Sequence, residues 1–435
     1  MKKNKTTIIA AGDLFMTRRI PEDGYDGFEE LQALIRKHDA RFVNLEMTFH
    51  DAEGFPAAES GGTWAMADPV MLDDVKRMGF NLFNTANNHS GDYGEGGVLA
   101  TIRHLKERNM VFSGTGRNLA GANAACYLET PGARIALISC CSSFSAASRA
   151  GGQSELLAGR PGLNPVRFKT YYHVDPEHYA MAEELARVTR CNDRKNYSVS
   201  MGYSNPFEKD TLPFGKEGIF VLDTENKVVT VPEKEDLERI AAEIREARRQ
   251  ADLVIVSYHS HEYRDGDHAL PARFTETFAR ACVDAGAQIF MGHGPHEMQG
   301  IEVYGEGVIF YSIGNFLFET ETVGLQPYDA YINRKMPVDT KVGAYMDDRS
   351  KNGTAGYGTL ENIWRAVLPS LECEDGRVRR VTLYPVSLQQ HERRSVKGIP
   401  VLSHDEKTLE YLAELSAPYG TALRIQGGEA EVVLS

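Results

Sequence analysis

The sequence predicts an α/β fold, and three observations indicate this class. Short apolar runs of strand character alternate with amphipathic stretches of helical period along most of the chain. Several of the apolar runs end in polar residues, as parallel strands do where their carboxyl ends form a ligand crevice. With 435 residues and 42% hydrophobic composition, the chain is long enough for one large α/β domain with insertions or for two ordinary domains.

The first part of the chain predicts repeated strand–helix units. Apolar residues alternate or run continuously in the predicted strands at residues 6–13, 40–46, 80–89 and 133–141. Between them, amphipathic periodicity predicts helices at residues 27–39, 68–79 and 94–109. This order is typical of stacked βα units with a mostly parallel sheet.

The rest of the chain repeats this pattern between two insertions. Residues 144–232 are rich in Gly, Pro, Ser and Tyr, and we expect an insertion that covers a site and holds one helix at 176–190. Helices are then predicted at 232–250 and 271–286, and strands at 251–260, 287–294 and 307–316. A second, irregular insertion is expected at 319–360, before antiparallel strands at 361–373 and 377–388 and a late helix at 404–420. We therefore predict a single domain over residues 1–435.

Composition excludes several classes of protein. The net charge of −13, from 61 acidic and 48 basic residues, argues against a nucleic-acid binder, because no basic field is present to collect phosphates. The six cysteines form no CxxC pair, which indicates reduced thiols. The start "MKKNK" is basic, but the apolar stretch after it is too short for a signal peptide, and no run is long enough to span a membrane. We expect a soluble, cytoplasmic protein, and nothing indicates its oligomeric state.

Polar residues of metal-ligand and acid/base type follow five of the predicted strands. These residues are Asp13, Glu46, the run Asn87, Asn88 and His89, the pair His259 and His261, and the pair His293 and His296. The last pair lies in "GHGPH", where Gly and Pro prevent a helix and allow both imidazoles to project from a tight turn. Because parallel strands end at one edge of a sheet, we expect these side chains to converge on one crevice.

Six motifs make the chain resemble a known family. "GDLFMTR", "NLE", "ANNHSGDYG", "VSYHSHEY", "GHGPHEMQGIE" and "YSIGNF" occur in the order found in the CapA family of capsule and poly-γ-glutamate synthesis proteins, over residues 6–320. That family is similar to the calcineurin-like metallophosphoesterases. The resemblance implies a metallophosphoesterase-like two-sheet sandwich flanked by helices, with a metal centre at the strand ends.

The resemblance also implies a set of metal ligands. The phosphoesterase pattern places one divalent metal on Glu46, Asn88, His259 and His293. Two imidazoles, one carboxylate and one amide oxygen suit Mn, Zn or Fe better than Ca or Mg. The second metal of the pattern needs a histidine where this chain has Phe15, and a final histidine two residues after His293 rather than three. We therefore expect one metal site on these four residues, whereas the chain departs from the pattern of the second site.

This departure suggests three functions. If Asp13 and His296 stay free beside one metal, they form an acid/base pair that removes and returns a proton, as in epimerisation at an α-carbon of a peptide or poly-glutamate-like substrate. The alternative is a metal-dependent hydrolase of amide or phosphoester bonds. A third reading is a non-catalytic accessory protein of poly-γ-glutamate or capsule synthesis.

Further residues support or extend this site. His89 is expected to act on the reacting group, or else to orient its loop, and Asp92 is placed to orient His89. His261, on the same face as His259, is expected to support the ligands from outside or to serve as a spare ligand. Asn315 in "SIGNF" is expected to fix the site loop by hydrogen bonds.

Three arginines are candidates for holding an anionic substrate. Arg18 belongs to the first motif of the resemblance, and its alternative is an ordinary surface position. Arg160 and Arg167 belong to a basic cluster of the first insertion that also contains Arg149 and Lys169. This cluster either holds substrate carboxylates or is simply a solvated loop.

Overall fold

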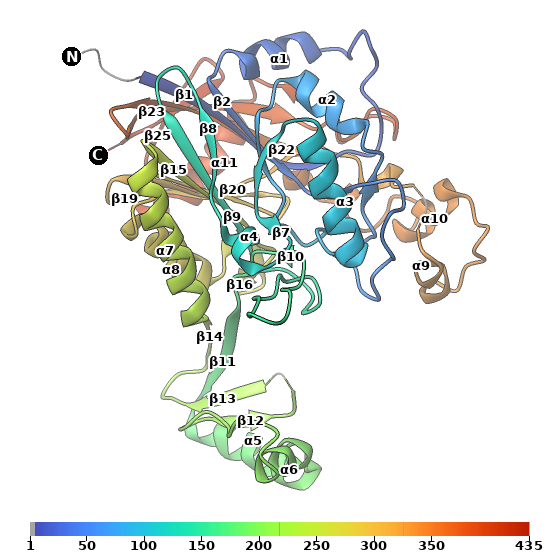
Figure 1. The fold of residues 1–435 in the computed structure, drawn as a ribbon, viewed down its shortest axis with the longest axis vertical. Helices are drawn as coiled ribbons and strands as arrows, with labels where there is room; N and C mark the ends of the chain where they lie inside the picture. Colours follow the sequence, from blue (N-terminus) through green and yellow to red (C-terminus); the bar gives the residue numbers. More distant parts are fainter. Residues whose placement is uncertain (1–4, 217, 325, 435) are drawn as a thin grey trace.

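Two β-sheets packed face to face form the body of the protein, and helices cover both outer faces (Figure 1). A computed structural model describes residues 5–216, 218–324 and 326–434. The predicted sandwich flanked by helices is confirmed. Each predicted helix is present, with its ends shifted by a few residues.

The larger sheet has the strand order β25-β26-β23-β22-β1-β2-β5-β6, with β21 beside β1 and β24 beside β23. Its strands are β1 (Lys5–Phe15), β2 (Ala40–Leu45), β5 (Leu82–Asn84), β6 (Val111–Ser113), β21 (Asn315–Phe318), β22 (Arg365–Glu374), β23 (Arg377–Ser387), β24 (Val401–Leu402), β25 (Leu423–Gln426) and β26 (Glu429–Val432). The pairs β1–β2, β2–β5 and β5–β6 are parallel, whereas β22 pairs antiparallel with both β1 and β23, as the sequence predicts for the last part of the chain.

The smaller sheet has the order β19-β20-β18-β15-β9-β8. Its strands are β8 (Cys126–Glu129), β9 (Arg134–Cys141), β15 (Leu253–His259), β18 (Ile289–His293), β19 (Met298–Tyr304) and β20 (Gly307–Ile313). The central strands β9, β15, β18 and β20 are parallel. Short pairs join β3 (Thr48–Phe49) to β4 (Met66–Ala67), β7 (Thr115–Gly116) to β10 (Gly162–Leu163), and β16 (Tyr263–Arg264) to β17 (Asp267–Pro271).

Apolar residues on alternating faces of the strands create three core layers. Ile8 and Ala10 of β1 pack between the sheets, against residues of the smaller sheet such as Ile255, whereas Ile9 and Ala11 face the helices outside the larger sheet. The helices on that side are α1 (Phe28–Arg36), α2 (Met71–Met78) and α3 (Gly94–Glu107), and the smaller sheet is covered by α7 (Lys234–Gln250) and α8 (Arg273–Asp284). α11 (Glu406–Ser416) packs on β19 and closes the core between the sheets.

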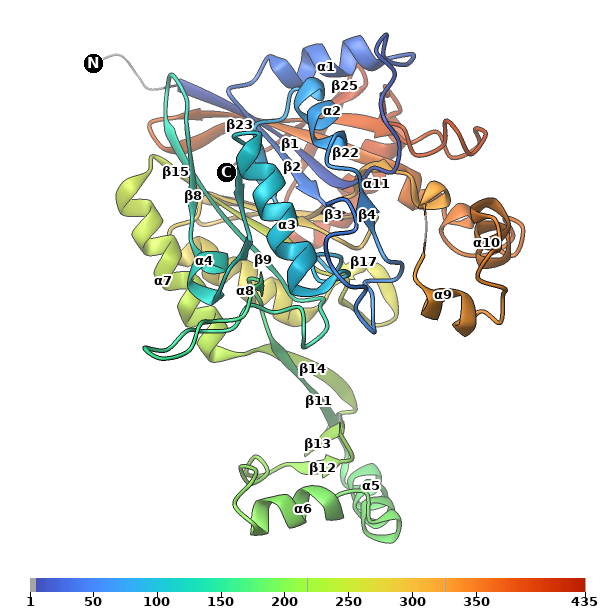
Figure 2. The ribbon, with the colours of Figure 1, turned by 45° about the vertical axis from the view of Figure 1, so that its right-hand side comes forward.

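The first insertion is more ordered than its composition suggests. Residues 168–232 form a sheet of order β12-β13-β11-β14 with two helices, and this arm projects away from the body in both views (Figures 1 and 2). Its elements are β11 (Phe168–Val174), α5 (Pro176–Thr189), α6 (Asp193–Ser200), β12 (Leu212–Phe214), β13 (Gly218–Leu222) and β14 (Lys227–Pro232). Stacking of Phe168 on Phe274, with ring centroids 4.1 Å apart, anchors the arm to α8.

The second insertion is not wholly irregular, as the sequence led us to expect. Residues 320–360 include α9 (Tyr328–Asn333), α10 (Val342–Arg349) and the short 3-10 turns η1 (Thr320–Thr322) and η2 (Tyr357–Thr359). The weak helical pattern was hidden by the Gly, Asp and Asn residues around these short elements. Buried Tyr345 and Met346 of α10 pack on the core outside the larger sheet, so this insertion belongs to the body.

The predicted strand at 80–89 is wrong in its second half, because β5 ends at Asn84. The Asn84 side chain accepts from the Ala86 N–H at 2.9 Å, and the Ser90 hydroxyl accepts from the Asn87 N–H at 2.9 Å. These side chains replace the ladder hydrogen bonds and turn the chain into a loop.

Two features expected from composition can be compared with the structure. The six cysteines are free thiols. Among the helices of the described ranges, none combines the length and apolarity that a membrane span requires. The basic start at residues 1–4 lies outside the described residues.

A bulge at Gly12 directs the next residue of β1 between the sheets. The pairing of β1 with β2 shifts register between Ala11 and Asp13. Without this shift Asp13 would share the face of Ile9 and Ala11, toward the helices. The bulge has no room for a side chain, because a Cβ atom on Gly12 would lie 1.8 Å from the carbonyl oxygen of Gly314.

We predict that Gly12→Ala lowers the midpoint of thermal unfolding by about 5 °C or more, because the added methyl group forces β1 away from Gly314. Gly152→Ala is the matched control, since no atom lies within 4 Å of a Cβ at that loop position. Circular dichroism melts of both metal-free variants provide the measurement. Equal midpoints for the two variants would contradict the argument.

Candidate metal centre

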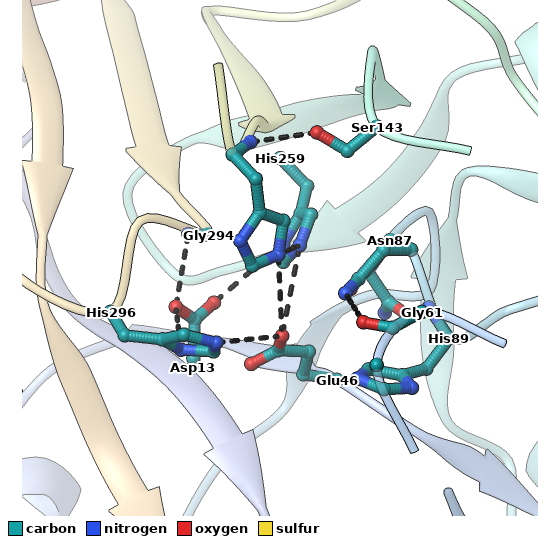
Figure 3. A network of polar contacts seen from close by, with 12 residues as sticks. Asp13, Glu46, Gly61, Asn87, His89, Ser143, His259, Gly294 and His296 are labelled. Atoms are coloured by element: carbon teal, nitrogen blue, oxygen red, sulfur yellow. Dashed lines mark hydrogen bonds and ion pairs between the residues drawn. The ribbon is translucent and has the colours of Figure 1, made fainter. Parts of the chain in front are cut away.

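The polar strand ends converge at one end of the sandwich, where β1, β2, β15 and β18 finish (Figure 3). Asp13, Glu46, His259 and His293 are each at most 1% exposed. In Figure 3 the Glu46 carboxylate lies between Asp13 and His296 on one side and His89 on the other. The expectation of one shared crevice is therefore met.

Parallel pairing of β15 with β18 places two imidazoles side by side. His259 is the register partner of His293, and their Nδ1 atoms are 3.0 Å apart. Ser257 Oγ contacts His293 Nε2 at 2.7 Å, so Nδ1 is the nitrogen that faces His259 and Asp13. The same register that builds the sheet thus orients both rings.

Asp13 completes a first group of metal-ligand type with these two histidines. Its Oδ1 atom lies 3.5 Å from His293 Nδ1 and 3.7 Å from His259 Nδ1. The carboxylate is fixed by the Asn44 amide, which donates to Oδ1 at 2.6 Å, and by the Gly294 N–H, which donates to Oδ2 at 2.9 Å. Asn44 is a residue that our sequence reasoning missed, although its place before Glu46 in "NLE" could have marked it.

Glu46 forms a second group with His261 and His296. Its Oε1 atom lies 3.8 Å from His296 Nε2, 3.9 Å from His261 Nε2 and 3.7 Å from His259 Nε2. Both carboxylate oxygens are buried, and neither has a hydrogen-bond partner among the described residues. A buried carboxylate of this kind is costly unless a cation pairs with it.

Asn88 presents a second orphaned oxygen. Its amide nitrogen donates to the Gly61 carbonyl at 2.9 Å, whereas its buried Oδ1 atom has no partner in the described part of the chain. Gly61 makes this approach possible, because a Cβ there would lie 2.8 Å from the Asn88 side chain. The oxygen is therefore held in a defined direction and is available as a ligand.

Burial sets the protonation of the site. It raises the pKa of Asp13 to about 7 and, together with the nearby charge of Asp13, raises the pKa of Glu46 well above its ordinary range. Burial also lowers the pKa of His293 and of His296 to about 3. The imidazoles are thus neutral, which is the form that binds metals, and the carboxylates lack a compensating charge.

These observations fit a divalent transition metal. The orphaned oxygens of Glu46 and Asn88 are the polar groups that a bound cation would satisfy. Imidazole nitrogens mixed with carboxylate oxygens suit Mn, Zn or Fe better than Ca or Mg. The two groups differ from the expected ligand set, since Asp13 and His296, expected to stay free, each belong to one of them.

His89 and His296 are each oriented by a hydrogen bond from Nδ1 to a polar side chain. His89 Nδ1 donates to Asp92 Oδ2 at 2.7 Å, as the sequence suggested, and Asp92 also accepts from the N–H groups of Gly61 and Ala65. His296 Nδ1 donates to Asn315 Oδ1 at 3.0 Å, and the Asn315 amide donates to the His296 carbonyl. Both rings keep Nε2 free of hydrogen bonds among the described residues.

The backbone of His296 is in the left-handed region, with φ of 66°. This conformation is uncommon for a residue with a side chain and is stabilised here by the two Asn315 hydrogen bonds. The extra residue of "GHGPH" therefore does not remove His296 from the centre. The left-handed backbone at His296 directs the imidazole toward Glu46 in spite of the extra residue.

The three candidate arginines do not face the centre. Arg18 is paired with Glu319 at 2.6 Å, and Arg167 is paired with Asp236 at 2.7 Å. Arg160 donates to the carbonyl of Arg149 at 3.0 Å. Arg18 and Arg167 thus already use their guanidinium groups in ion pairs, and none of the three arginines lines the cavities that contain His261 or His296. The geometry therefore gives no support to a substrate-binding role for them.

Two cavities open beside the metal-ligand groups. One of about 310 Å³ has a polar lining that includes Asn88, Ser143, Ser145 and His261. The other, of about 30 Å³, is lined by residues that include Phe15, His89, His296, Arg349 and Tyr357. Gly61 lines both. Sequence reasoning missed Ser143, which lies in the loop after β9, and Arg349 and Tyr357, which lie in the second insertion, because these segments have no recognisable pattern.

A family model and several relatives associate this chain with the same protein family. The family model described as "Bacterial capsule synthesis protein PGA_cap" matches residues 7–320. The chain is 32% identical to the uncharacterized protein y4sH of Sinorhizobium fredii over 97% of this chain and 91% of that protein. It is 27% identical to the capsule biosynthesis protein CapA of Bacillus anthracis over 73% of this chain and 61% of that protein.

One further relative and one solved structure each match this chain over less than two thirds of their own length. The PGA biosynthesis protein CapA of Bacillus subtilis is 28% identical over 71% of this chain and 62% of its own length. The chain thus matches less than two thirds of either CapA protein. A solved 5'-nucleotidase structure from Staphylococcus aureus, described as putative and in complex with alpha-ketoglutarate, aligns with 94% of this chain and 58% of that chain at 12% identity and a TM-score of 0.35.

We predict that the protein binds two divalent ions per chain, because the Asp13 and Glu46 groups use different histidines. His293→Ala should lose the ion of the Asp13 group, and His296→Ala the ion of the Glu46 group. Elemental analysis after loading with Mn or Zn and removal of free ion is the measurement, with the exposed His178→Ala as control. A single ion in the unsubstituted protein would contradict this.

Glu46→Gln is predicted to have opposite effects on the two forms of the protein. The amide removes a buried carboxylate without a partner, so the metal-free variant should unfold at the same or a higher temperature than the unsubstituted protein. The metal-loaded variant should unfold at a lower temperature, because it loses ligand-linked stabilisation. Thermal unfolding with and without a chelator tests both signs. A lower midpoint in both forms would show that Glu46 has a structural role independent of metal.

Proposed function

The chain belongs to the bacterial capsule synthesis protein family PGA_cap, and we propose that it is a metal-dependent hydrolase of amide bonds in a peptide or poly-glutamate-like substrate. The observation that carries the proposal is the pair of metal-ligand groups around Asp13 and Glu46. Divalent ions bound there would polarise a substrate carbonyl and lower the pKa of water. The residues themselves hold the site, exclude water and move protons.

The protein's own proton carrier in this proposal is His89, because His296 serves as a ligand in the Glu46 group. His89 lines the 30 Å³ cavity, and Asp92 orients its ring through Nδ1, so that Nε2 is left for a substrate. This nitrogen accepts a proton from the attacking water and then returns it to the leaving nitrogen. The contact of His89 Nδ1 with Asp92 Oδ2, at 2.7 Å, fixes the direction of Nε2, which favours His89 as the base.

Epimerisation is the second candidate, but with a different pair of residues from the one suggested by the sequence. Asp13 Oδ2 lies 3.7 Å from His296 Nδ1, and Asp13 is fully buried. A substrate carbon between two proton carriers needs about 6 Å between them, so the geometry argues against Asp13 and His296 as that pair. His89 and His296, which line the same cavity, are the pair that would serve this reaction in a protein whose His296 holds no metal.

The substrate class is inferred from the family and from the character of the site. The named relatives act in capsule or PGA biosynthesis, which supports a peptide-like polymer as substrate. A non-catalytic accessory role is less well supported, because such a protein has no use for buried carboxylates that lack a partner. The cytoplasmic location stays a prediction.

We predict that the metal-loaded protein cleaves γ-linked glutamate oligomers with incorporation of one oxygen-18 atom from labelled water into the new carboxylate. His89→Gln should lower kcat by about 100-fold or more while metal content is unchanged, because it loses a proton carrier and no ligand. His178→Gln, on the exposed arm, is the control. Mass spectrometry of the products measures both the cleavage and the label.

Running the same incubation in deuterium oxide separates the two candidate reactions. Deuterium at an α-carbon of uncleaved oligomer, without oxygen-18 uptake, would replace hydrolysis by epimerisation. Neither label in any product, with the metals bound, would reject both reactions for this substrate class.

A further inference from the structure

The second insertion supplies a wall of the candidate active site. Thr320, Arg349 and Tyr357 line the 30 Å³ cavity together with His89 and His296, and the same three residues line an adjoining cavity of about 210 Å³. The two spaces therefore meet at Arg349 and Tyr357. A substrate held at the metal centre can extend past these residues into the larger space.

Tyr357 connects the second insertion to the metal centre through a ring contact with His296. Its ring packs edge-on to His296, with centroids 5.1 Å apart, and lies 5.7 Å from Phe318. The Trp364 indole donates to the Tyr357 carbonyl at 2.9 Å. These contacts fix the segment that faces Arg349 across the cavity.

Arg349 stands out because its charge is not compensated. The side chain is half-buried at the end of α10, and it makes no hydrogen bond or ion pair with any residue of the described ranges. Burial lowers its pKa from the ordinary value, so the charged form is held at a cost. Of the described residues that line the two cavities, it is the one that is a lysine or arginine.

The neighbouring carboxylates are already neutralised by other cations. Glu321, in the lining of the larger cavity, is paired with Lys397 at 2.6 Å and with Arg394 at 3.5 Å. On α10 itself, Asp347 pairs with Arg394 and Asp348 pairs with Arg334. The guanidinium of Arg349 is thus left for a group that does not belong to this segment.

We propose that Arg349 is the specificity-determining residue that binds a carboxylate of the substrate next to the reacting bond. A guanidinium presents two parallel N–H donors that match one carboxylate, whereas phosphate groups are usually bound by several donors. Besides Arg349, the side-chain donors of this cavity's described lining are the hydroxyls of Thr320, Ser350 and Tyr357, and no second cation is among them, which favours the carboxylate. This inference rests on the proposed function for its substrate class, and it assigns the recognition step to α10.

The test compares binding of two probes that differ only in charge. One probe is γ-linked tri-glutamate, and the other is the same peptide with its pendant carboxylates converted to primary amides. Calorimetric titrations use Zn-loaded protein with His89→Gln, so that turnover does not interfere. We expect Arg349→Met to raise the Kd of the carboxylate probe about tenfold or more and to leave the Kd of the amide probe unchanged.

Two further variants make the result specific. Arg349→Lys keeps the charge but not the paired donors, and should give an intermediate loss for the carboxylate probe. Arg393→Met removes an exposed arginine of the neighbouring loop and should change neither Kd. Because Arg349 has no partner to lose among the described residues, Arg349→Met should not lower the unfolding midpoint.

The outcomes separate this inference from the proposed function. Equal losses for both probes, no loss in Arg349→Met, or an unsubstituted protein that does not prefer the carboxylate probe would each overturn the role of Arg349, even if the oligomer is hydrolysed. Carboxylate binding that depends on Arg349, without oxygen-18 uptake by the enzyme that retains His89, would support the inference and reject only hydrolysis.

Discussion

The burial of Asp13 and Glu46 at the same end of a β-sandwich is the constraint on which the site depends. Both carboxylates are fully inaccessible, their neighbours are neutral imidazoles, and the oxygens of Glu46 have no hydrogen-bond partner among the described residues. Taking such groups out of water costs several kcal/mol unless a cation is near. The buried carboxylates therefore lower the free energy of unfolding of the metal-free protein. Binding of a divalent ion can restore this loss.

The fold delivers this arrangement through backbone features rather than through a single motif. Parallel pairing aligns His259 with His293, and the bulge at Gly12 turns Asp13 from the helix-facing side to the space between the sheets. Gly61 allows the loop between β3 and β4 to contact Asn88. The left-handed conformation of His296 brings its ring to Glu46. Each feature is local, but their common result is a set of donors with fixed directions.

Much of this was predictable from the sequence, for a physical reason. Strand ends and their polar residues follow from hydrophobic periodicity, so the α/β class, its helices and the convergence of Asp13, Glu46, His259 and His293 could be anticipated. The two-sheet sandwich was implied only by the resemblance to the CapA family. The grouping of the ligands could not, because it depends on the bulge at Gly12 and on the turn at His296, which no periodicity reports. Arg349 and Tyr357 were missed for a similar reason, since short helices and turns in an insertion have no pattern that indicates which cavity they face.

Local charge, rather than net charge, decides which substrate such a site can accept. A chain with net charge −13 repels an anionic polymer at long range, yet that repulsion is screened beyond about 8 Å at physiological ionic strength. Within the cavity, Glu321 is neutralised by Lys397, whereas Arg349 is not matched by any described carboxylate. An anionic group that reaches this space therefore meets a positive local field. Discrimination between charged and neutral substrates then depends on contacts inside the cavity, because a partly buried guanidinium interacts more strongly with a charge than one in open water does.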